Sequence, residues 1–416
     1  MQFNVNKNIH LYKNSSFLYF FHILFLPLSD NNTFTYMKKL FIIALTMLST
    51  VAVSAQEKKP VKWINNVKLS GYGMLQYKGS TQKGGKSNSF DLRLARVSLD
   101  GRIFNDWYWK AQIQFNGNTA TLGSSPRVVD LFVEWQKFPF LMVKAGQFKR
   151  PFTFENPMNP IDQGFMSYSQ NVSALAGFSD RAGAQASNGR DIGVQLQGDF
   201  LKNSEGRNLL HYQIGVFNGQ GINTTDADQQ KYIIGGIWVM PVKGMRIGAF
   251  GWTGSYARKG TWKTIAEDGV TEVEHSGVRS LQQRRYAFSA EYKVSDWTFR
   301  TEYIHSTGKA FKTRNQKSGD TSDCTVNEAV GSQADGVYAL VIAPVLTKKL
   351  YAKARYDMYR PTAEWNKMKT QYEIGLNYLF HKNIQVNAEY AFVNDRSLAA
   401  DSHNYSVFDV ELDFRF

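Results

Sequence analysis

The sequence is poor in cysteine and in long apolar runs, and each shortage excludes a class of protein. One cysteine among 416 residues, Cys324, excludes a disulfide framework and a cysteine-based zinc site within one chain. After Ala55 no apolar run approaches the roughly 18 residues that a transmembrane helix needs. Hydrophobic residues make up 43% of the chain and the mean hydropathy is −0.37, which is not the composition of a helical membrane protein.

Signals for catalysis, metal binding and nucleic-acid binding are also missing. The seven histidines are scattered and no nucleophile motif accompanies them, so we predict no catalytic residue and no enzyme. Asp226 and Asp228 lack the glycine and the bidentate glutamate of a calcium loop, so no metal and no cofactor is expected. The net charge of +14 suits anionic lipid, anionic solutes or nucleic acid, but no nucleic-acid motif is present.

The first 55 residues are interpreted as a targeting region. A positive start at Met37 is followed by a short apolar core and by the small residues Val53 and Ala55, which predicts a secretory signal peptide over 37–55. Residues 1–36 are interpreted as an artefact upstream of the true start, or as an unstructured extension. Residues 56–67 are expected to form a short periplasmic segment.

The remaining chain is rich in segments in which apolar and polar residues alternate. The clearest example is the end of the sequence, where the apolar residues are Phe408, Val410, Leu412, Phe414 and Phe416 and the residues between them are Asp409, Glu411, Asp413 and Arg415. A period of two places these sets on opposite faces of a strand, one suited to lipid and one to water. A soluble edge strand shows the same alternation, so this segment alone does not decide between a membrane barrel and a sandwich.

A census of such segments predicts about sixteen strands, an even number as single-chain bacterial barrels have. The predicted ranges are 68–77, 89–104, 107–116, 127–138, 141–149, 190–200, 208–217, 230–240, 244–256, 282–294, 297–305, 334–343, 349–359, 369–380, 383–393 and 404–416. A break of phase near Ala95 and Arg96 predicts a β-bulge.

The connections between these segments alternate in length, which provides an independent test. The longer polar stretches are 78–88, 117–126, 150–189, 218–229, 257–281, 306–333, 360–368 and 394–403, and a short turn separates each from the next. A transmembrane barrel with short periplasmic turns and long extracellular loops produces this pattern, whereas a Greek-key sandwich has no reason to. We therefore predict an all-β fold, a transmembrane antiparallel β-barrel over 68–416 with both ends on the periplasmic side.

The longest connection, 150–189, is unusually apolar for a loop in water, so it is expected to pack on the inner wall. The candidate constriction residues are Phe154, Phe165, Tyr168 and Arg181. The alternatives are an outer cap and a contact between protomers. Because a barrel of sixteen strands leaves a water-filled interior, some device must set its size limit.

Three motifs carry a resemblance to a known family. They read F-D-L-R-L-A-R-V-S-L-D-G at 90–101, V-K-A-G-Q-F-K-R-P-F at 143–152 and G-R-D-I-G-V-Q-L at 189–196. In order and spacing they resemble the phosphate-selective porin O and P family, over about Leu69 to Phe416. The resemblance implies a sixteen-stranded trimer in the outer membrane of a Gram-negative bacterium. It also implies passive uptake of small hydrophilic solutes, with anion or phosphate preference.

The resemblance also implies a pore lined by arginine and lysine. The pore-lining and anion-binding candidates are Arg93, Arg96, Arg102, Lys110, Lys144, Lys149, Arg150 and Arg190. On the predicted inward face of the strands, however, eleven basic residues stand against fourteen acidic ones. The wall therefore favours a weakly selective porin, while the resemblance favours phosphate.

The expected partners follow from the predicted location. They are outer-membrane lipid and lipopolysaccharide, small hydrophilic or anionic solutes, two further copies in a homotrimer, and the barrel-assembly machinery, which reads the final aromatic residue of the family, here Phe416. The long loops carry many lysines and arginines, which suit lipid phosphates, anion steering or plain solvation equally. A binding or adhesion barrel that does not conduct is the alternative function.

Overall fold

In the computed structural model, residues 63–116, 126–183, 188–313 and 322–416 are described. The signal peptide predicted over 37–55 and the segment 1–36 lie outside the described residues. The strands are β1 (Ile64–Ser80), β2 (Ser87–Ile103), β3 (Trp107–Gln114), β4 (Arg127–Phe138), β5 (Leu141–Lys149), β6 (Arg190–Lys202), β7 (Asn208–Phe217), β8 (Tyr232–Val239), β9 (Met245–Ile265), β10 (Glu272–Val294), β11 (Trp297–Thr307), β12 (Ser322–Asp323), β13 (Gln333–Val345), β14 (Thr347–Arg360), β15 (Lys369–His381), β16 (Ile384–Asp395) and β17 (Asn404–Arg415).

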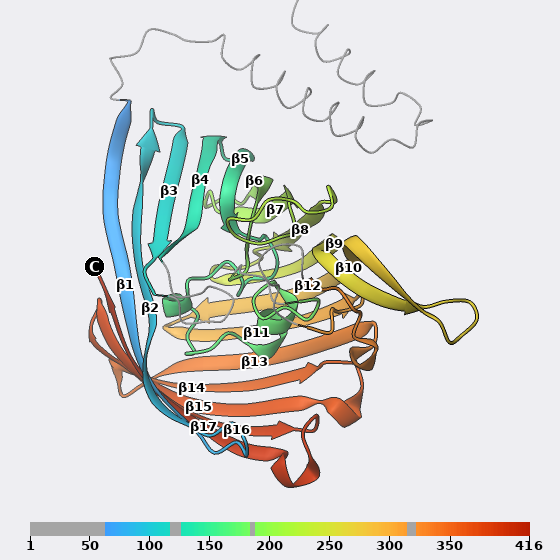
Figure 1. Cartoon of the computed structure of the whole chain (residues 1–416). Helices are drawn as coiled ribbons and strands as arrows, with labels where there is room; N and C mark the ends of the chain where they lie inside the picture. The colour runs from blue at the N-terminus through green and yellow to red at the C-terminus, as the bar shows by residue number, and fades with distance from the viewer. Residues whose placement is uncertain (1–62, 117–125, 184–187, 314–321) are drawn as a thin grey trace, which may run out of the picture. The chain divides into compact units, whose positions relative to one another are not determined.

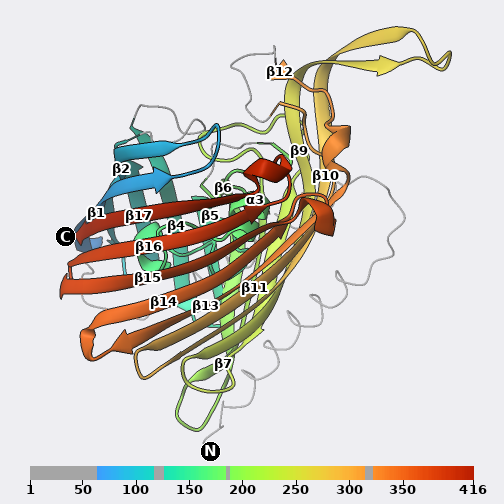
Figure 2. The same cartoon turned by 90° about the horizontal axis from the view of Figure 1, so that it is seen from below.

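Sixteen of these strands form one closed antiparallel barrel (Figures 1 and 2). Each long strand pairs with its neighbour along the chain, and β1 pairs with β17 over Tyr72–Ser80 to close the ring. The backbone N–H groups of Gly71 and Phe416 each donate to the other's carbonyl at 3.0 Å, which extends the seam to the last residue. The two-residue β12 is an addition outside this ring and pairs with β9 in parallel. The predicted fold class is confirmed.

Every predicted strand is present, but some boundaries are wrong. The stretch 257–281, predicted as a loop, is mostly strand, because β9 and β10 continue as a hairpin beyond the rest of the barrel (Figure 2). Both ends of the stretch 78–88 are likewise strand, 78–80 in β1 and 87–88 in β2. Because β1 begins at Ile64, the segment expected to be periplasmic loses its last residues to the barrel.

The predicted bulge exists, two residues earlier than expected. Met74 pairs with Leu94 and Leu75 pairs with Leu92, so Arg93 is the extra residue of β2. The strand changes phase there, since Leu92 is exposed at 47% while Leu94 is buried at 6%. The bulge therefore turns Arg93 and Leu94 to the inside together, where Leu94 packs on Tyr72 and Met74.

The two faces of the wall differ as the alternation predicts. On β15 and β17 the outward side chains are apolar yet exposed, for example Ile374 at 62% and Phe408 at 45%. The residues between them, such as Glu373 and Glu411, are buried at 4% and 1%. This arrangement suits a barrel surrounded by lipid and filled with polar groups. No helix among the described residues is long and apolar enough to cross a membrane.

The connections alternate in length as expected. At one end of the barrel the strands are joined by turns of at most a few residues, such as Ser295–Asp296 between β10 and β11. At the other end lie the long connections, of which 150–189 is the longest. We refer to these ends as the short-turn end and the long-loop end.

Glycine 71 allows the seam between β1 and β17 to close. A Cβ at Gly71 would lie 2.7 Å from the carbonyl oxygen of Arg96 and would also collide with the ring of Phe416. Gly71→Ala should therefore destabilise the closed barrel by about 1–3 kcal/mol. The measurement is the temperature at which the detergent-solubilised barrel loses its compact mobility in gel electrophoresis.

Gly79→Ala is the matched control on the same strand, because a Cβ there would meet nothing closer than 3.7 Å. Gly79→Ala should leave the transition unchanged or raise it slightly, since alanine loses less backbone entropy than glycine. Equal transition temperatures for the two variants would contradict the close-packed seam.

Candidate functional site inside the barrel

The segment 150–189 is called here the inner segment, and its described residues, 150–183 and 188–189, lie inside the barrel (Figures 1 and 2). It contains the 3-10 helix η1 (Pro160–Asp162) and the short helix α3 (Gln170–Leu175). Its aromatic and apolar side chains are almost fully buried, with Phe152 at 0% and Leu175 at 0%. The expectation that this apolar connection packs on the inner wall rather than on water agrees with these contacts.

Aromatic rings attach the beginning of the inner segment to β9. Phe152 meets Trp252 edge to face at a centroid distance of 5.3 Å, and Phe154 meets Phe250 at 5.4 Å. Arg150 is fully buried in the same cluster, with its guanidinium 5.1 Å from the ring centroid of Trp252. Phe154, predicted as a constriction residue, thus packs against the inner wall at β9.

Helix α3 approaches the backbone of β13 closely. A Cβ at Gly336 would lie 2.7 Å from the Cβ of Asn171, so only glycine fits there. The side-chain amide of Asn171 donates to the carbonyl oxygen of Glu302 at 3.0 Å. The side chains of Val172 and Leu175 are buried in the same cluster as Ile304 of β11. The helix is thus held against β11 and β13.

Carboxylates of the wall accept hydrogen bonds from backbone N–H groups of the inner segment. The contacts are Glu302 Oε1 with Phe154 (2.7 Å) and Glu155 (3.0 Å), Asp357 Oδ2 with Gln170 (2.8 Å), and Glu389 Oε1 with Met166 (2.9 Å). Each carboxylate satisfies backbone donors that would otherwise be buried without a partner. Three strands, β11, β14 and β16, contribute to this set.

Cations of the wall bind the carbonyl groups of the same segment. The contacts are Arg285 with Leu175 (2.7 Å), Lys353 with Gly164 (3.0 Å), Arg355 with Ser167 (2.9 Å), and Arg300 with Gln163. Acidic and basic side chains of β10 to β16 therefore both bind the backbone of the inner segment. Sequence analysis placed these side chains on the inner face but missed this role, for which periodicity gives no signal.

A buried ion pair also holds the inner segment against the wall. The carboxylate of Asp180 lies 2.6 Å from the guanidinium of Arg285, and both side chains are at most 1% exposed. Burial alone would raise the pKa of Asp180, but the charge and hydrogen bonds of Arg285 outweigh it, so the pKa is lowered from its ordinary value. Asp180 is therefore an anion at neutral pH.

Arg181, predicted as a constriction residue, ties the inner segment to another loop. Its guanidinium donates to the carbonyl groups of Gly308, Val330 and Gly331 in the connection between β11 and β13, and to that of Pro361. Burial lowers the pKa of Arg181 from its ordinary value. The side chain of Arg181 thus connects the inner segment to two other loops at the long-loop end.

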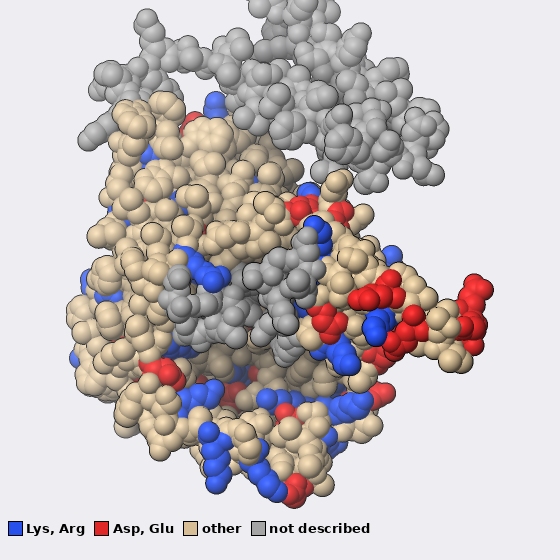
Figure 3. All heavy atoms as spheres, in the orientation of Figure 1, with Lys and Arg blue, Asp and Glu red and all other residues tan. Residues whose placement is uncertain are grey.

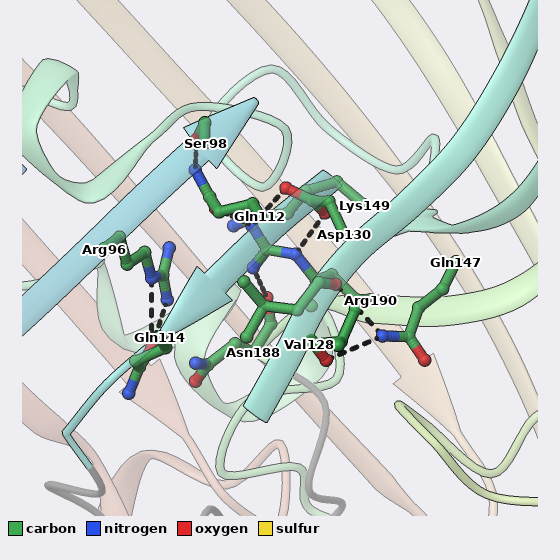
Figure 4. A network of polar contacts seen from close by, with 12 residues as sticks. Arg96, Ser98, Gln112, Gln114, Val128, Asp130, Gln147, Lys149, Asn188 and Arg190 are labelled. Carbon is green, nitrogen blue, oxygen red and sulfur yellow. Dashed lines mark hydrogen bonds and ion pairs between the residues drawn. The ribbon is translucent and has the colours of Figure 1, made fainter. Parts of the chain in front are cut away.

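Half of the basic candidates are ion-paired with neighbouring carboxylates. The pairs are Arg93–Glu411 (2.8 Å), Lys144–Glu134 (3.6 Å), Arg150–Asp191 (2.7 Å) and Arg190–Asp130 (2.6 Å). Figure 4 shows Arg190 between Asp130 and Gln112, and Arg96 bonded to Gln114. Arg102 lies apart, near the short-turn end, where it bonds to Gln136 and to the carbonyl of Asn105.

Four of the basic candidates surround one cavity of about 290 Å³, called here the basic recess. Its charged lining residues are Lys110, Lys144, Lys149 and Arg190 against the single acidic residue Asp130. The Nζ of Lys149 donates to the hydroxyl of Tyr168 at 3.0 Å and faces the ring of Phe178 at 4.8 Å. The inner segment supplies Pro151, Pro157 and Asn159, and the other described lining residues belong to strands.

Two further cavities lie on the other side of the inner segment. The long-loop cavity, of about 710 Å³, is lined by Ser167 and Tyr168 of the inner segment and by loop residues such as Gln82 and Pro361. The short-turn cavity, of about 250 Å³, is lined by Gly164 and Phe165. Figure 3 shows a hollow with blue and red side chains in the lower part of the view, where Figure 1 places β14 to β17.

The two cavities follow one another along β16 and β17. On β16 the short-turn cavity includes Asn387 and the long-loop cavity includes Glu389, the next inward residue. On β17 the corresponding residues are Glu411 and Asp409. The two cavities therefore reach successive inward residues of the same two strands, on either side of the contact between Met166 and Glu389. We call the level of Asn387, Glu389, Asp409 and Glu411 the neck.

Among the described residues no group of histidine, cysteine and acidic side chains is arranged to hold a metal ion. The described interior offers contacts that hold the inner segment, a basic recess and two cavities that follow one another along β16 and β17. Such an arrangement lets solute pass beside a folded-in loop, as in a channel.

Comparisons with known proteins agree with this geometry. The model of the phosphate-selective porin O and P family matches residues 70–358. No curated protein matches. Among solved structures, OmpT of Vibrio cholerae in a trimer form is 13% identical with a TM-score of 0.52, over 84% of this chain and 99% of that chain. The outer membrane channel DcaP of Acinetobacter baumannii is 13% identical with a TM-score of 0.52, over 87% and 100%.

OmpF of Salmonella typhi is 12% identical with a TM-score of 0.54, over 84% of this chain and 97% of that chain. At these identities the structures show a shared fold, which is the closed barrel described above. Together with the family match they indicate a channel rather than an enzyme and place the protein in the outer membrane of a Gram-negative bacterium. Since the family model covers well over half of the sequence, the chain belongs to the phosphate-selective porin O and P family and is an outer-membrane porin.

Proposed function

We propose that small hydrophilic solutes cross this porin by passive diffusion along one route, through the long-loop cavity, the neck and the short-turn cavity. The observation that carries the proposal is that these two cavities are lined by successive inward residues of β16 and β17. Elsewhere the interior is occupied by the aromatic cluster of Phe152 and Phe154 and by helix α3 against β11 and β13. The inner segment thus acts as the constriction, with Phe165 and Tyr168 at its open edge.

The preference for phosphate or other anions stays a prediction. Arg93, Arg150 and Arg190 are each within 2.8 Å of a carboxylate, so much of their charge is neutralised locally. Lys110, Lys144 and Lys149 face the basic recess, which shares no lining residue with the other two cavities. In this proposal the recess is a side pocket that attracts anions without setting the selectivity of the main route.

The remaining expectations about partners are also proposals. A homotrimer is supported by the trimer form of OmpT, which has the same fold. Contact with lipid is supported by the exposed apolar outer face, and recognition by the barrel-assembly machinery by Phe416, which is 58% exposed. Lys83 and Lys367 at the long-loop end suit the phosphates of lipopolysaccharide.

Single-channel recording in planar bilayers tests the proposed function. The purified protein should produce stepwise conductance, and proteoliposomes should swell in small sugars and progressively less in larger ones. Heat-unfolded protein at the same concentration is the control. Correctly folded protein that gives neither conductance nor swelling would instead support the alternative, an adhesion or binding barrel that does not conduct.

A further inference from the structure

We propose that the basic recess is a binding site for a phosphorylated sugar, and that the bound molecule connects the beginning of the inner segment, 150–159, to the wall at β3 to β7. The recess shares no lining residue with the two cavities of the proposed route. The ligand is therefore a bound component of the folded channel and not the solute that crosses it. The inference goes beyond the proposed function and does not depend on conductance.

The inner segment is attached differently on its two sides. Toward β10 to β16, charged side chains of the wall bond directly to its backbone, as Glu302 and Lys353 do. Toward β3 to β7, no bond joins Lys110 or Lys144 to the described part of the segment. These two lysines instead line the recess of about 290 Å³, which Asn159 lines from the segment. A ligand in the recess therefore supplies the contacts that the wall makes directly on the other side.

The recess carries positive charge that the described protein groups do not neutralise. Its single acidic lining residue, Asp130, is already paired with Arg190 at 2.6 Å. The Nζ of Lys149 donates to two uncharged oxygens of the inner segment, at 2.8 and 3.0 Å. Lys110 forms no salt bridge with any described residue, including Asp100, which lies opposite it on β2. Because an enclosed cation without a counter-charge is costly, an anion that enters the recess is stabilised there.

The number of uncompensated charges indicates which anionic group the recess binds. Lys110 and Lys149 together match a group with two negative charges. A phosphate monoester carries about 1.5 to 2 negative charges at pH 7, whereas a carboxylate carries about one. Lys144 adds a third ammonium group, which lies over the rings of Phe132 and Phe148 at 5.1 and 5.4 Å and is 3.6 Å from a carboxylate. Three ammonium groups thus line one cavity and can bind the three terminal oxygens of a monoester.

The rest of the recess suits a small organic molecule with hydroxyl groups. Pockets for such molecules begin at about 300 Å³, so inorganic phosphate leaves most of this space to water. Gln213 lines the recess and is only 9% exposed, yet its side-chain amide has no hydrogen-bond partner among the described residues. A buried amide without a partner is the independent sign that a polar ligand reaches it. Gln195 offers a second amide, and Phe148 and Pro151 offer an apolar surface, a combination that fits the hydroxyl groups and the apolar faces of a sugar.

Isothermal titration calorimetry of the purified protein in detergent and phosphate-free buffer tests the site. The probe is glucose 6-phosphate, and the comparison ligands are inorganic phosphate, glucuronate and glucose. Glucose 6-phosphate should bind roughly tenfold more tightly than each of the three, because it alone meets both the lysines and the amides. Absence of heat with glucose 6-phosphate would overturn the inference, as would equal binding of inorganic phosphate or of glucuronate.

Substitutions then assign the binding to the recess. Lys110→Gln together with Lys144→Gln should weaken the binding of glucose 6-phosphate by roughly tenfold or more. Gln213→Met should weaken it by roughly two- to tenfold and leave inorganic phosphate unchanged. Lys293→Gln is the matched control, because this lysine of β10 lies outside the recess, and it should bind as the wild type does. Gel mobility before and after heating checks that each barrel has folded. A control as weak as the double lysine variant would overturn the assignment.

Deuterium uptake of backbone amides, followed by mass spectrometry, tests the connection to the inner segment. Glucose 6-phosphate should slow uptake within 151–159 by roughly twofold or more and leave α3 unchanged, because only the first stretch lines the recess. The double lysine variant should show no slowing. Binding that slows neither stretch, or both equally, would overturn the connecting role. None of these measurements needs a current, so a folded protein without conductance refutes the proposed function and leaves this inference standing.

Discussion

Replacing residues 158–180 by a flexible glycine-serine linker is expected to raise the single-channel conductance roughly two- to fivefold, because the interior of a sixteen-stranded barrel is wide once nothing fills it. The replaced stretch includes η1, α3 and Phe165, which together separate the long-loop cavity from the basic recess. Their removal joins these spaces into one water-filled interior. The wall charges that bind the inner segment then face water and remain solvated.

The measurement is the size of unitary current steps in planar bilayers, together with the largest sugar that enters proteoliposomes. A variant that shortens the hairpin tip between Ile265 and Glu272 is the matched control, because that tip lies beyond the barrel (Figure 2). The control should conduct like the wild type. Unchanged current steps in a correctly folded linker variant would show that the inner segment is not the constriction.

The strands of the barrel were predictable because lipid enforces a period of two. Over Tyr372–Tyr378 of β15 and Phe408–Phe414 of β17 the outward positions are apolar and the inward positions are polar or small, so the strands can be recognised from one sequence. The hairpin of β9 and β10 was missed because no lipid surrounds it. Its two faces both carry polar residues, as the successive residues Lys263 and Thr264 of β9 show, so alternation of polarity disappears while the strands continue.

The position of the inner segment was predictable for a similar reason. Aromatic residues such as Phe152 and Phe165 cannot remain in water, and the inner wall is the nearest surface that can cover them. The contacts that hold the segment were not predictable. Alternation shows that Glu302 and Arg285 point inward, but their partners lie more than a hundred residues away in the chain. The residues next to Glu302 and Arg285 in the sequence do not indicate which distant residues they contact.

The roles of the basic candidates show the same limit. Arg190 and Asp130 are on β6 and β4, which are not adjacent, so pairwise strand register does not reveal their ion pair. A motif resemblance identified Arg190 as important without identifying what it contacts. Charge counts over a whole wall also mislead, because most of the inward charges between β10 and β16 bind the inner segment rather than the solute.

Arg285→Met is expected to release the end of the inner segment and to make the open channel unstable. The substitution leaves Asp180 buried without its partner, and breaking a buried ion pair in this way costs about 3–5 kcal/mol. It also removes the donor to the carbonyl of Leu175, the last residue of α3. Since the barrel wall is held by its own strand pairing, we expect the closed barrel to survive while the segment moves.

The readouts are current noise in the open state and cleavage within 150–189 by an added protease, both of which should increase. Arg285→Met combined with Asp180→Leu is the matched control, because replacing both partners of a buried pair by apolar groups is far less costly than removing one. Noise and cleavage in the double variant should fall back toward the wild type. Equal behaviour of single and double variants would show that the ion pair does not hold the segment.

The same ion pair predicts how the channel responds to acid. Because the pKa of Asp180 is lowered in the folded protein, its contribution to stability is complete above the unfolded pKa of about 4 and is lost only as the pH falls through the lower folded value. Wild-type channels at about pH 5 should therefore keep their quiet open state, since Asp180 stays ionised there. The Arg285→Met variant has an anion with no partner, so protonation relieves it, and its noise should decrease on acidification. A decrease in noise that occurs in the variant alone would assign the stability of the constriction to this pair, whereas the same response in both proteins would refute that assignment.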